Sequence, residues 1–216
     1  MTTLDLFGSP AEGEREWLGS QAVVLRGQAA PCAVELLDAV EAIVAQSPFR
    51  QMVTPGGLTI AVASTNCGAL GWTSDRRGYR YDGIDPLCGR PWPAMPGCFM
   101  HLAQQAAADA GFLGFEPDAC LINQYLPGTK LSLHQDKNER DFNAPIVSVS
   151  LGMTAVFLFG GHDRGERAFR ISLHHGDVAV WGGVDRLRYH GVMALADAPH
   201  AQLGNRRINL TIRKAG

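Results

Sequence analysis

Residues 146–159 read Ile-Val-Ser-Val-Ser-Leu-Gly-Met-Thr-Ala-Val-Phe-Leu-Phe, and this stretch decides the fold class. It contains two short runs typical of β-strands, Ile146–Leu151 and Thr154–Phe159, separated by a turn with a glycine. Similar runs occur before and after it, over Ala119–Leu126, Lys130–His134, Phe169–Leu173, Asp177–Trp181, Leu187–Val192 and Arg207–Arg213. About eight short strands predict two packed antiparallel sheets, a double-stranded β-helix or jelly roll, and an open α+β sheet is the alternative.

Two amphipathic helices are expected before these strands. The first begins near Pro31, and its apolar face consists of Leu36, Leu37, Val40, Ile43 and Val44. The second runs from Met95 to Gly111, with Gly111 as its C-cap and an apolar side made of Phe99, Leu102, Ala103, Ala106 and Ala110. We expect both helices to cover one sheet face, which makes the fold mainly β with flanking helices (α+β).

Composition excludes several classes of protein. The 216 residues are 46% hydrophobic and 19% charged, as in a globular domain, and the formal net charge of −2 excludes an overall basic, histone-like protein. Five cysteines without a CxxC pair disfavour a disulfide framework or a structural zinc site and favour a reducing compartment. No apolar stretch reaches the roughly 18 residues of a membrane span. We therefore expect a cytoplasmic monomer that does not bind membranes.

The chain is expected to contain one domain, residues 21–216, preceded by a loosely held arm, residues 1–20. Within the domain, residues 47–93 have a different composition, with Pro55-Gly56-Gly57, several arginines and the aromatic residues Trp72 and Tyr79. A loop region of this kind predicts a hairpin-rich flap that contacts a ligand or a polymer.

One pair of side chains predicts a metal site. In His134-Gln135-Asp136 the imidazole and the carboxylate lie on the same face of an extended segment. A second histidine from a distant strand would complete the facial triad that binds Fe(II) in non-haem oxygenases. His190, in a late strand, is the predicted third ligand, and Gly191 beside it is expected to leave room around the metal.

Other interpretations of these histidines are open at this point. An H-x-D pair is frequent by chance, and a strand histidine is more often a hydrogen-bonded core residue. His174 and His175 are rival third ligands, but His175-Gly176-Asp177 is typical of a turn, which would direct both imidazoles to solvent.

The last strand carries polar and apolar residues in alternation. Arg207 and Arg213 lie six residues apart and therefore on one face, together with Asn209 and Thr211. Arginines on an inward face need an anion, and a dicarboxylate fits two guanidinium forks. The pattern leaves a solvated outer face equally open.

A second polar pair precedes the metal motif. Asn123 and Tyr125 also share a strand face, which leads toward His134, and both could donate hydrogen bonds to a carboxylate. Ordinary strand polarity is the alternative interpretation of this pair.

These motifs occur in a recognisable order, Asn123–Gly128, His134–Lys137, His190 and Arg207-x-Asn209-x-x-x-Arg213. The set resembles the AlkB family of Fe(II)- and 2-oxoglutarate-dependent dioxygenases. The resemblance extends to 47–57, 91–96 and 181–183, and so covers nearly the whole chain.

The resemblance implies a jelly roll in which His134, Asp136 and His190 hold iron, with 2-oxoglutarate and O2 as co-substrates. It implies that Arg213 assists the keto-acid end of 2-oxoglutarate and that Arg207 binds the distal carboxylate. The supporting contacts that it implies are Asn123, Tyr125 and Asn209.

The resemblance also implies a nucleotide-recognition lid over residues 47–93. Trp72 and His134 would enclose the damaged base, Tyr79 would contact the backbone and Arg164 would lie at the pocket rim. Lys137 and Asn138 would lie beside the substrate. Bacterial relatives carry an acidic residue at the position of Asn138, and a basic one at that of Gln124, so these departures affect base preference and local charge.

The activity implied is oxidative dealkylation of N-methylated bases, of the 1-methyladenine and 3-methylcytosine type. Formaldehyde is released while 2-oxoglutarate becomes succinate and CO2. The implied substrate is single-stranded or flipped-base DNA, with RNA as an open possibility. Phosphate contacts would come from among Arg50, Arg76, Arg77, Arg80, Lys130 and Lys137. The alternatives are a 2-oxoglutarate-dependent hydroxylase of a protein or small molecule, and a catalytically silent jelly-roll binding module.

Overall fold

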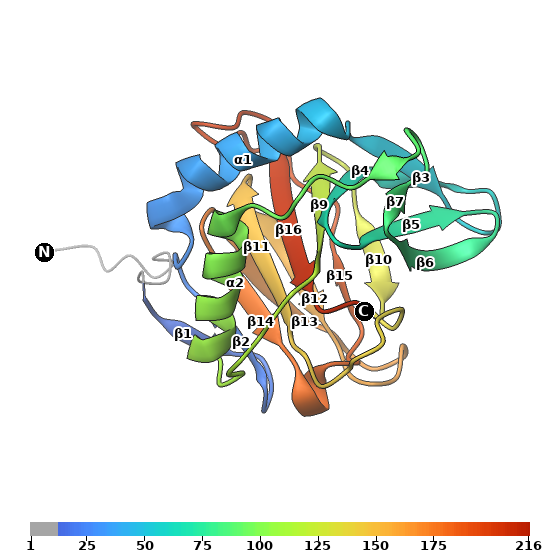
Figure 1. The fold of residues 1–216 in the computed structure, drawn as a ribbon. Helices are drawn as coiled ribbons and strands as arrows, with labels where there is room; N and C mark the ends of the chain where they lie inside the picture. Colours follow the sequence, from blue (N-terminus) through green and yellow to red (C-terminus); the bar gives the residue numbers. More distant parts are fainter. Residues whose placement is uncertain (1–12) are drawn as a thin grey trace, which may run out of the picture.

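Two antiparallel sheets lie face to face in the computed structural model, which describes residues 13–216 (Figure 1). The larger sheet has the order β1 (Arg15–Trp17), β2 (Ala22–Leu25), β14 (Val178–Trp181), β11 (Ile146–Gly152), β16 (Arg207–Arg213), β9 (Ala119–Tyr125), β4 (Thr59–Gly68), β3 (Arg50–Val53). The smaller sheet has the order β10 (Leu131–His134), β15 (His190–Val192), β12 (Ala155–Phe159), β13 (Phe169–Leu173). The predicted jelly roll is confirmed.

Two short hairpins extend beyond these sheets, at the end of the molecule occupied by β3 and β10 (Figure 1). One pairs β5 (Gly71–Asp75) with β6 (Gly78–Asp82), and the other pairs β7 (Ile84–Asp85) with β8 (Arg90–Pro91). We call the β5–β6 pair the lid hairpin.

The two predicted helices cover the outer face of the larger sheet (Figure 1). Pro31 lies in a single 3-10 turn, η1 (Ala30–Cys32), and α1 (Ala33–Gln46) begins after it. Leu36, Val40 and Ile43 are buried, at the spacing of one helix face. Leu37 and Val44, predicted on the same face, are only partly buried.

The second helix, α2 (Gly97–Asp109), starts two residues later than expected and buries Phe99 and Leu102. Its cap is Ala110, and Gly111 follows with a φ of 92°, a conformation that favours glycine.

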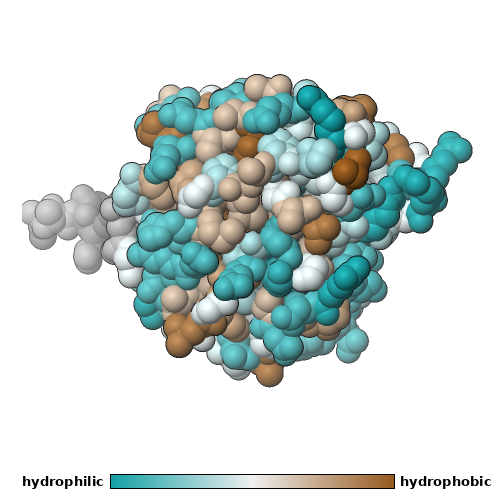
Figure 2. Space-filling model, in the orientation of Figure 1, coloured by the Kyte–Doolittle hydropathy of each residue, from teal (hydrophilic) through white to brown (hydrophobic). Residues whose placement is uncertain are grey.

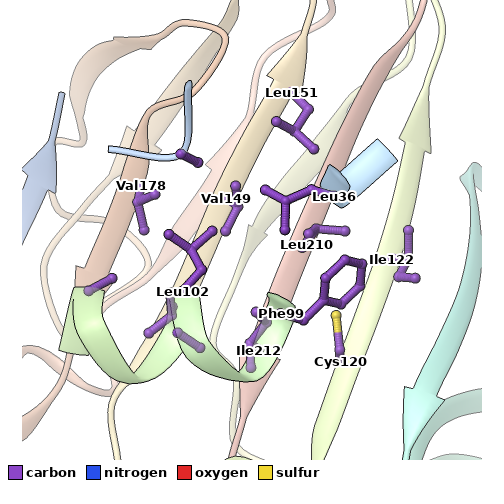
Figure 3. Close-up of a cluster of buried hydrophobic side chains, with 14 of the residues drawn as sticks. Leu36, Phe99, Leu102, Cys120, Ile122, Val149, Leu151, Val178, Leu210 and Ile212 are labelled. Carbon is purple, nitrogen blue, oxygen red and sulfur yellow. The ribbon is translucent and has the colours of Figure 1, made fainter. Parts of the chain in front are cut away.

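The core has two parts, one on each face of the larger sheet. Side chains from α1 and α2, such as Leu36 and Phe99, pack on Ile122, Val149 and Leu210 (Figure 3). On the other face, the larger sheet packs against the smaller one, and this second core consists of Ala22, Val24, Val62, Tyr125, Ile146, Met153, Ala155, Phe157, Phe159, Ile171, Leu173, Ala179, Trp181, Val192 and Leu195. Because β16 is buried on both faces, its polar residues lie between the two sheets and not on the solvated side.

Two predicted segments contain strands of the larger sheet. Part of the predicted arm, Arg15–Trp17, forms β1 and pairs with β2 at the edge of the larger sheet, while residues 1–12 lie outside the described residues. Within the predicted flap, residues 47–93, β3 and β4 belong to the larger sheet and β4 pairs with the central strand β9, while the extent of the lid stays a prediction. The part of it that stands apart from the sheets begins at β5.

Hydrophobic and hydrophilic residues are mixed on the surface. Hydrophobic residues on the face drawn in Figure 2 are scattered among hydrophilic ones. Within residues 13–216, no helix is both long enough and apolar enough to cross a membrane.

Candidate metal centre and nucleotide site

The predicted metal ligands come together in the structure. His134 ends β10 and His190 begins β15, and the two residues are paired across these strands with ring centroids 4.5 Å apart. Asp136 follows β10 and places Oδ1 3.6 Å from His134 Nε2 and Oδ2 3.4 Å from His190 Nε2. One ligand atom from each residue lies within 4.8 Å of the other two. This donor set is the facial triad that suits Fe(II).

Both imidazoles are oriented by the backbone of their own strands. His134 Nδ1 lies 2.9 Å from the Ser132 carbonyl oxygen, and His190 Nδ1 lies 3.0 Å from the Arg188 carbonyl oxygen. A proton on each Nδ1 satisfies these carbonyls and leaves Nε2 with a lone pair toward the metal. Burial, and next the neighbouring His190, lower the pKa of His134 to about 4, so this ligand is neutral at physiological pH.

Gly191 has a different role from the one expected. A Cβ at this position would lie 2.7 Å from the Leu131 carbonyl oxygen and 3.1 Å from the Leu133 nitrogen, both in the backbone of β10. The glycine therefore allows β10 and β15 to approach closely, which brings the two ligand histidines together.

The rival histidines lie elsewhere. His175 accepts a hydrogen bond from the Gly152 amide and stacks on His200, with ring centroids 4.5 Å apart. His174 Nδ1 lies 3.2 Å from Thr154 Oγ1. Neither belongs to the group of possible metal ligands found among residues 13–216.

The two arginines of β16 are buried, as their strand is. Arg213 Nη2 donates to Asp136 Oδ2 at 2.6 Å, so this guanidinium touches the metal triad. Although burial opposes it, the charge of Arg213 holds the pKa of Asp136 well below its usual range. Arg213 Nη1 donates to the Tyr81 hydroxyl at 2.7 Å.

Arg207 is a buried cation without a counter-ion among the described residues. Its Nη2 donates to Ser150 Oγ at 2.9 Å, while Nε and Nη1 have no hydrogen-bond partner within residues 13–216. The guanidinium lies 5.0 Å from the centre of the Tyr125 ring, and burial lowers the pKa of Arg207. Buried donors of this kind require an anion, so the site fits the free carboxylate of a keto-diacid.

The lid hairpin adds two aromatic side chains. The rings of Trp72 on β5 and Tyr79 on β6 stack at 5.7 Å with an angle of 14° between their planes. Trp72 Nε1 donates to Asn138 Oδ1 at 3.4 Å, and Asn138 lies two residues after the metal ligand Asp136. An aromatic platform therefore contacts the segment that directly follows the metal ligand Asp136. A cavity of about 340 Å³ adjoins it, lined by Leu70, Tyr79, Arg80, Tyr81, Asn138, Arg140, Ala215 and Gly216.

Comparison with known proteins agrees with this donor set. The family model of the 2OG-Fe(II) oxygenase superfamily matches residues 21–213. The alpha-ketoglutarate-dependent dioxygenase AlkB of Salmonella typhimurium is 57% identical over 98% of both chains. This chain belongs to the AlkB family. It is therefore an Fe(II)- and 2-oxoglutarate-dependent dioxygenase that consumes O2.

Two further proteins are similar to this chain, one over part of its sequence and one in its fold. The nucleic acid dioxygenase ALKBH1 of Mus musculus is 35% identical to this AlkB-family chain, over 50% of this chain and 28% of the mouse protein. The solved structure of OsALKBH1 superposes with a TM-score of 0.80 at 26% identity, covering 93% of this chain and all of that one.

The predicted supporting residues of this AlkB-family chain are placed as follows. Asn123 Oδ1 accepts a hydrogen bond from Ser64 Oγ at 2.8 Å, which orients its amide. Asn209 Nδ2 donates to Ser148 Oγ at 2.8 Å and to the Val149 carbonyl at 3.0 Å. Asn209 is thus already hydrogen-bonded within the sheet, and its contact with 2-oxoglutarate stays a prediction.

The basic residues predicted to contact nucleic acid differ in whether they already form an ion pair within the protein. Asp75 pairs with both Arg77 and Arg80, and Asp85 pairs with Arg50. Lys137 and Arg164 are exposed, as are Arg76 and Lys130, and these four form no ion pair in the part of the chain that the structure describes. The four unpaired cations are the better candidates for phosphate contacts.

Three residues near the site were not found from the sequence. Tyr81, Glu139 and Arg186 form a hydrogen-bonded and ionic cluster around Arg213. The one available signal was that Glu139 follows Asp136 closely, but these residues lie in an irregular segment. Without a regular period, the sequence does not indicate which side chains turn inward.

Proposed function

We propose that His134, Asp136 and His190 hold Fe(II), and that Arg213 and Arg207 bind the keto-acid end and the distal carboxylate of 2-oxoglutarate. The metal, the co-substrate and O2 together supply an oxidation in which 2-oxoglutarate becomes succinate and CO2. The protein orients the two imidazoles through backbone carbonyls and neutralises the co-substrate with buried guanidinium groups. Burial between the sheets excludes water from these contacts.

We further propose that the substrate is a nucleic acid carrying N-methylated bases of the 1-methyladenine and 3-methylcytosine type, from which the methyl carbon is lost as formaldehyde. The observation that carries this proposal is the stacked Trp72–Tyr79 pair beside Asn138 and the metal triad. A flat aromatic surface suits a base, whereas an aliphatic side chain would gain little from stacking. The mouse relative is a nucleic acid dioxygenase, which agrees with this class of substrate.

The nucleic-acid strand must present its methylated base to the metal triad. A base inside a duplex cannot reach a site between two sheets, so the nucleotide must be single-stranded or flipped out. A methyl group on the pairing edge blocks base pairing and so lowers the free energy needed to flip the nucleotide out, which favours damaged bases. Trp72 and His134 would enclose the base, Tyr79 would contact the backbone, Lys137 would meet a phosphate and Arg164 would lie at the pocket rim. The chain would act on DNA, and on RNA as a second substrate, as a cytoplasmic monomer.

Asn138 is the residue through which we infer an effect on base preference. It offers a neutral amide where the resemblance to bacterial relatives implies an acidic side chain, and its Oδ1 already accepts a hydrogen bond from Trp72. A cationic methylated base gains no ion pair there. We therefore propose a smaller preference for cationic lesions over neutral ones than an acidic residue would produce.

The test is the Trp72→Ala variant, assayed with methylated single-stranded oligonucleotides by mass spectrometry. Loss of base stacking, worth roughly 1–3 kcal/mol, should lower kcat/KM on the oligonucleotide by about 10-fold or more. Succinate formation without oligonucleotide should persist, because the triad and the arginines are untouched.

Trp17→Ala is the matched control, because this tryptophan is exposed and lies on β1, at the opposite edge of the larger sheet from β3. Unchanged oligonucleotide turnover in Trp72→Ala would show that Trp72 does not stack on the base, whereas succinate formation without any oligonucleotide turnover in the unaltered protein would favour the hydroxylase of a protein or small molecule. The absence of Fe(II)-dependent succinate formation in the unaltered protein would favour a silent binding module.

A further inference from the structure

Four buried charged side chains meet at the metal triad, and only one of them, Asp136, is a predicted metal ligand. They are two carboxylates and two guanidinium groups, Asp136, Glu139, Arg186 and Arg213. The side chain of Glu139 is 1% exposed and that of Arg186 is 2% exposed, with 3.2 Å between Glu139 Oε2 and Arg186 Nη2. Two negative and two positive groups balance, which makes their burial tolerable. Glu139 must therefore serve something other than metal ligation.

One neutral side chain joins this cluster from the lid hairpin. The Tyr81 hydroxyl, on β6, accepts a hydrogen bond from Arg213 Nη1 at 2.7 Å and donates one to Glu139 Oε1 at 2.7 Å. The hydroxyl thus uses its donor and an acceptor position at once. A phenylalanine ring would fill the same space and make neither contact.

These contacts determine how Arg213 is presented to the site. Its Nη1 is held by Tyr81 and lies 3.5 Å from Glu139 Oε1, while its Nη2 donates to Asp136 Oδ2. A guanidinium group is planar, so fixing Nη1 also fixes the direction of Nη2. The hydroxyl of Tyr81 is the link that joins Arg213 to Glu139 at hydrogen-bond distance.

We propose that Tyr81 and Glu139 are positioning residues for the co-substrate: acting through Arg213, they hold the guanidinium edge that meets the keto-acid end of 2-oxoglutarate. This inference rests on the proposed contact of Arg213 with 2-oxoglutarate. It makes the lid hairpin part of the co-substrate site as well as of the base site, because Tyr81 belongs to the same strand as Tyr79.

The first test is the dissociation constant of 2-oxoglutarate in the Tyr81→Phe variant. The Fe(II)-loaded protein is titrated without oxygen, and binding is followed by the visible charge-transfer band. We expect the dissociation constant to rise about tenfold, the effect of one lost hydrogen bond to a charged group. Fe(II) affinity, measured in the absence of 2-oxoglutarate, should be unchanged because the triad is intact.

Ser74→Ala is the matched control for the loss of a buried hydroxyl. Ser74 lies in the same hairpin, on β5, and donates to the Val53 carbonyl at 2.6 Å without contacting Arg213. Its 2-oxoglutarate dissociation constant should equal that of the unaltered protein. An equal rise in Ser74→Ala and Tyr81→Phe would show general loosening of the hairpin and overturn the positioning role.

A double-variant cycle tests whether Tyr81 acts through Arg213. Lysine at position 213 retains the charge but has no planar fork to be oriented. In the Arg213→Lys background, Tyr81→Phe and Glu139→Gln should each change the dissociation constant by less than about twofold. A full tenfold effect of Tyr81→Phe in both backgrounds would overturn the inference.

The same cycle separates this inference from the proposed function on which it rests. If Arg213→Lys weakens 2-oxoglutarate binding but Tyr81→Phe does not, the positioning role is wrong and the role of Arg213 stands. If Arg213→Lys leaves binding unchanged, the proposed contact of Arg213 is wrong, and the positioning role is wrong with it.

Discussion

Replacing Arg207 with methionine is expected to move stability and co-substrate binding in opposite directions. Arg207 is 1% exposed, and two of its nitrogens lack a partner among residues 13–216. An uncompensated buried charge costs several kcal/mol, whereas the hydrogen bond to Ser150 returns only about 1 kcal/mol. Methionine fills a similar space without charge. We expect the free Arg207→Met protein to gain about 2 kcal/mol in its free energy of unfolding, or roughly 4–8 °C in Tm.

The same two unpartnered nitrogens of Arg207 determine how much 2-oxoglutarate affinity the variant loses. Two free donors of Arg207 can each form a charge-assisted hydrogen bond to the distal carboxylate, at about 1.5–3 kcal/mol apiece. Taking the lower value for both, the dissociation constant of 2-oxoglutarate should rise about 100-fold.

Thermal unfolding of the Fe(II) protein without oxygen, at increasing 2-oxoglutarate, measures both effects. The ligand should raise the Tm of the unaltered protein and have little effect on Arg207→Met. Arg206→Met is the control, because Arg206 is exposed and pairs with Glu41 at the surface. A destabilised Arg207→Met protein with unchanged 2-oxoglutarate affinity would refute the reasoning and make Arg207 a structural residue.

Three further predictions concern the metal, pH and the core. His190→Ala should abolish Fe(II)-dependent succinate formation, whereas His174→Ala should retain it, and equal loss in both would contradict the triad. Burial, and next His200, lower the pKa of His175 below its ordinary 6.5, so its stabilising contribution is complete above about pH 6.5 and is lost as pH falls through the folded-state value. The decrease in Tm between pH 7.5 and 5.5 should therefore be smaller in His175→Gln, and an equal decrease would exclude this residue. Leu36→Ala should lower the free energy of unfolding by about 2–5 kcal/mol in a urea titration, and a loss under about 1 kcal/mol would mean that α1 packs loosely.

Regular strands explain why much of the site could be predicted from the sequence. Along β16 the alternation of Ile208, Leu210 and Ile212 with polar residues predicted which side chains share a face. It could not decide whether the polar face was inside, because that depends on a second sheet contributed by residues distant in the chain. The structure places Arg207 and Arg213 between the sheets, which only a polar site makes tolerable.

The strands β1 and β4 could not be placed from the sequence, for a similar physical reason. β1 has only three residues, and both Arg15 and Trp17 are exposed, so no apolar alternation marked it as a strand. β4 is buried because β3 and β9 flank it, a property of the assembled sheet that the local composition of residues 47–93 does not contain. Tyr81 and Glu139 were missed because they contact each other, Arg186 and Arg213 only in the folded protein, and these residues lie far apart in the sequence.

The contact between Gly191 and the backbone of β10 limits how this protein can change over evolutionary time. His134 and His190 face each other because β10 and β15 pair at these two positions, beyond an irregularity in the register that follows Leu131, and slipping one strand by a single position would turn a ligand to the opposite face. Asp136 and the paired strands β11 to β14 lie between the two histidines, so only the loops that join those strands can lengthen or shorten while the pairing survives. Insertions in loops are therefore compatible with catalysis here, whereas one added methyl group at position 191 would separate the two imidazoles.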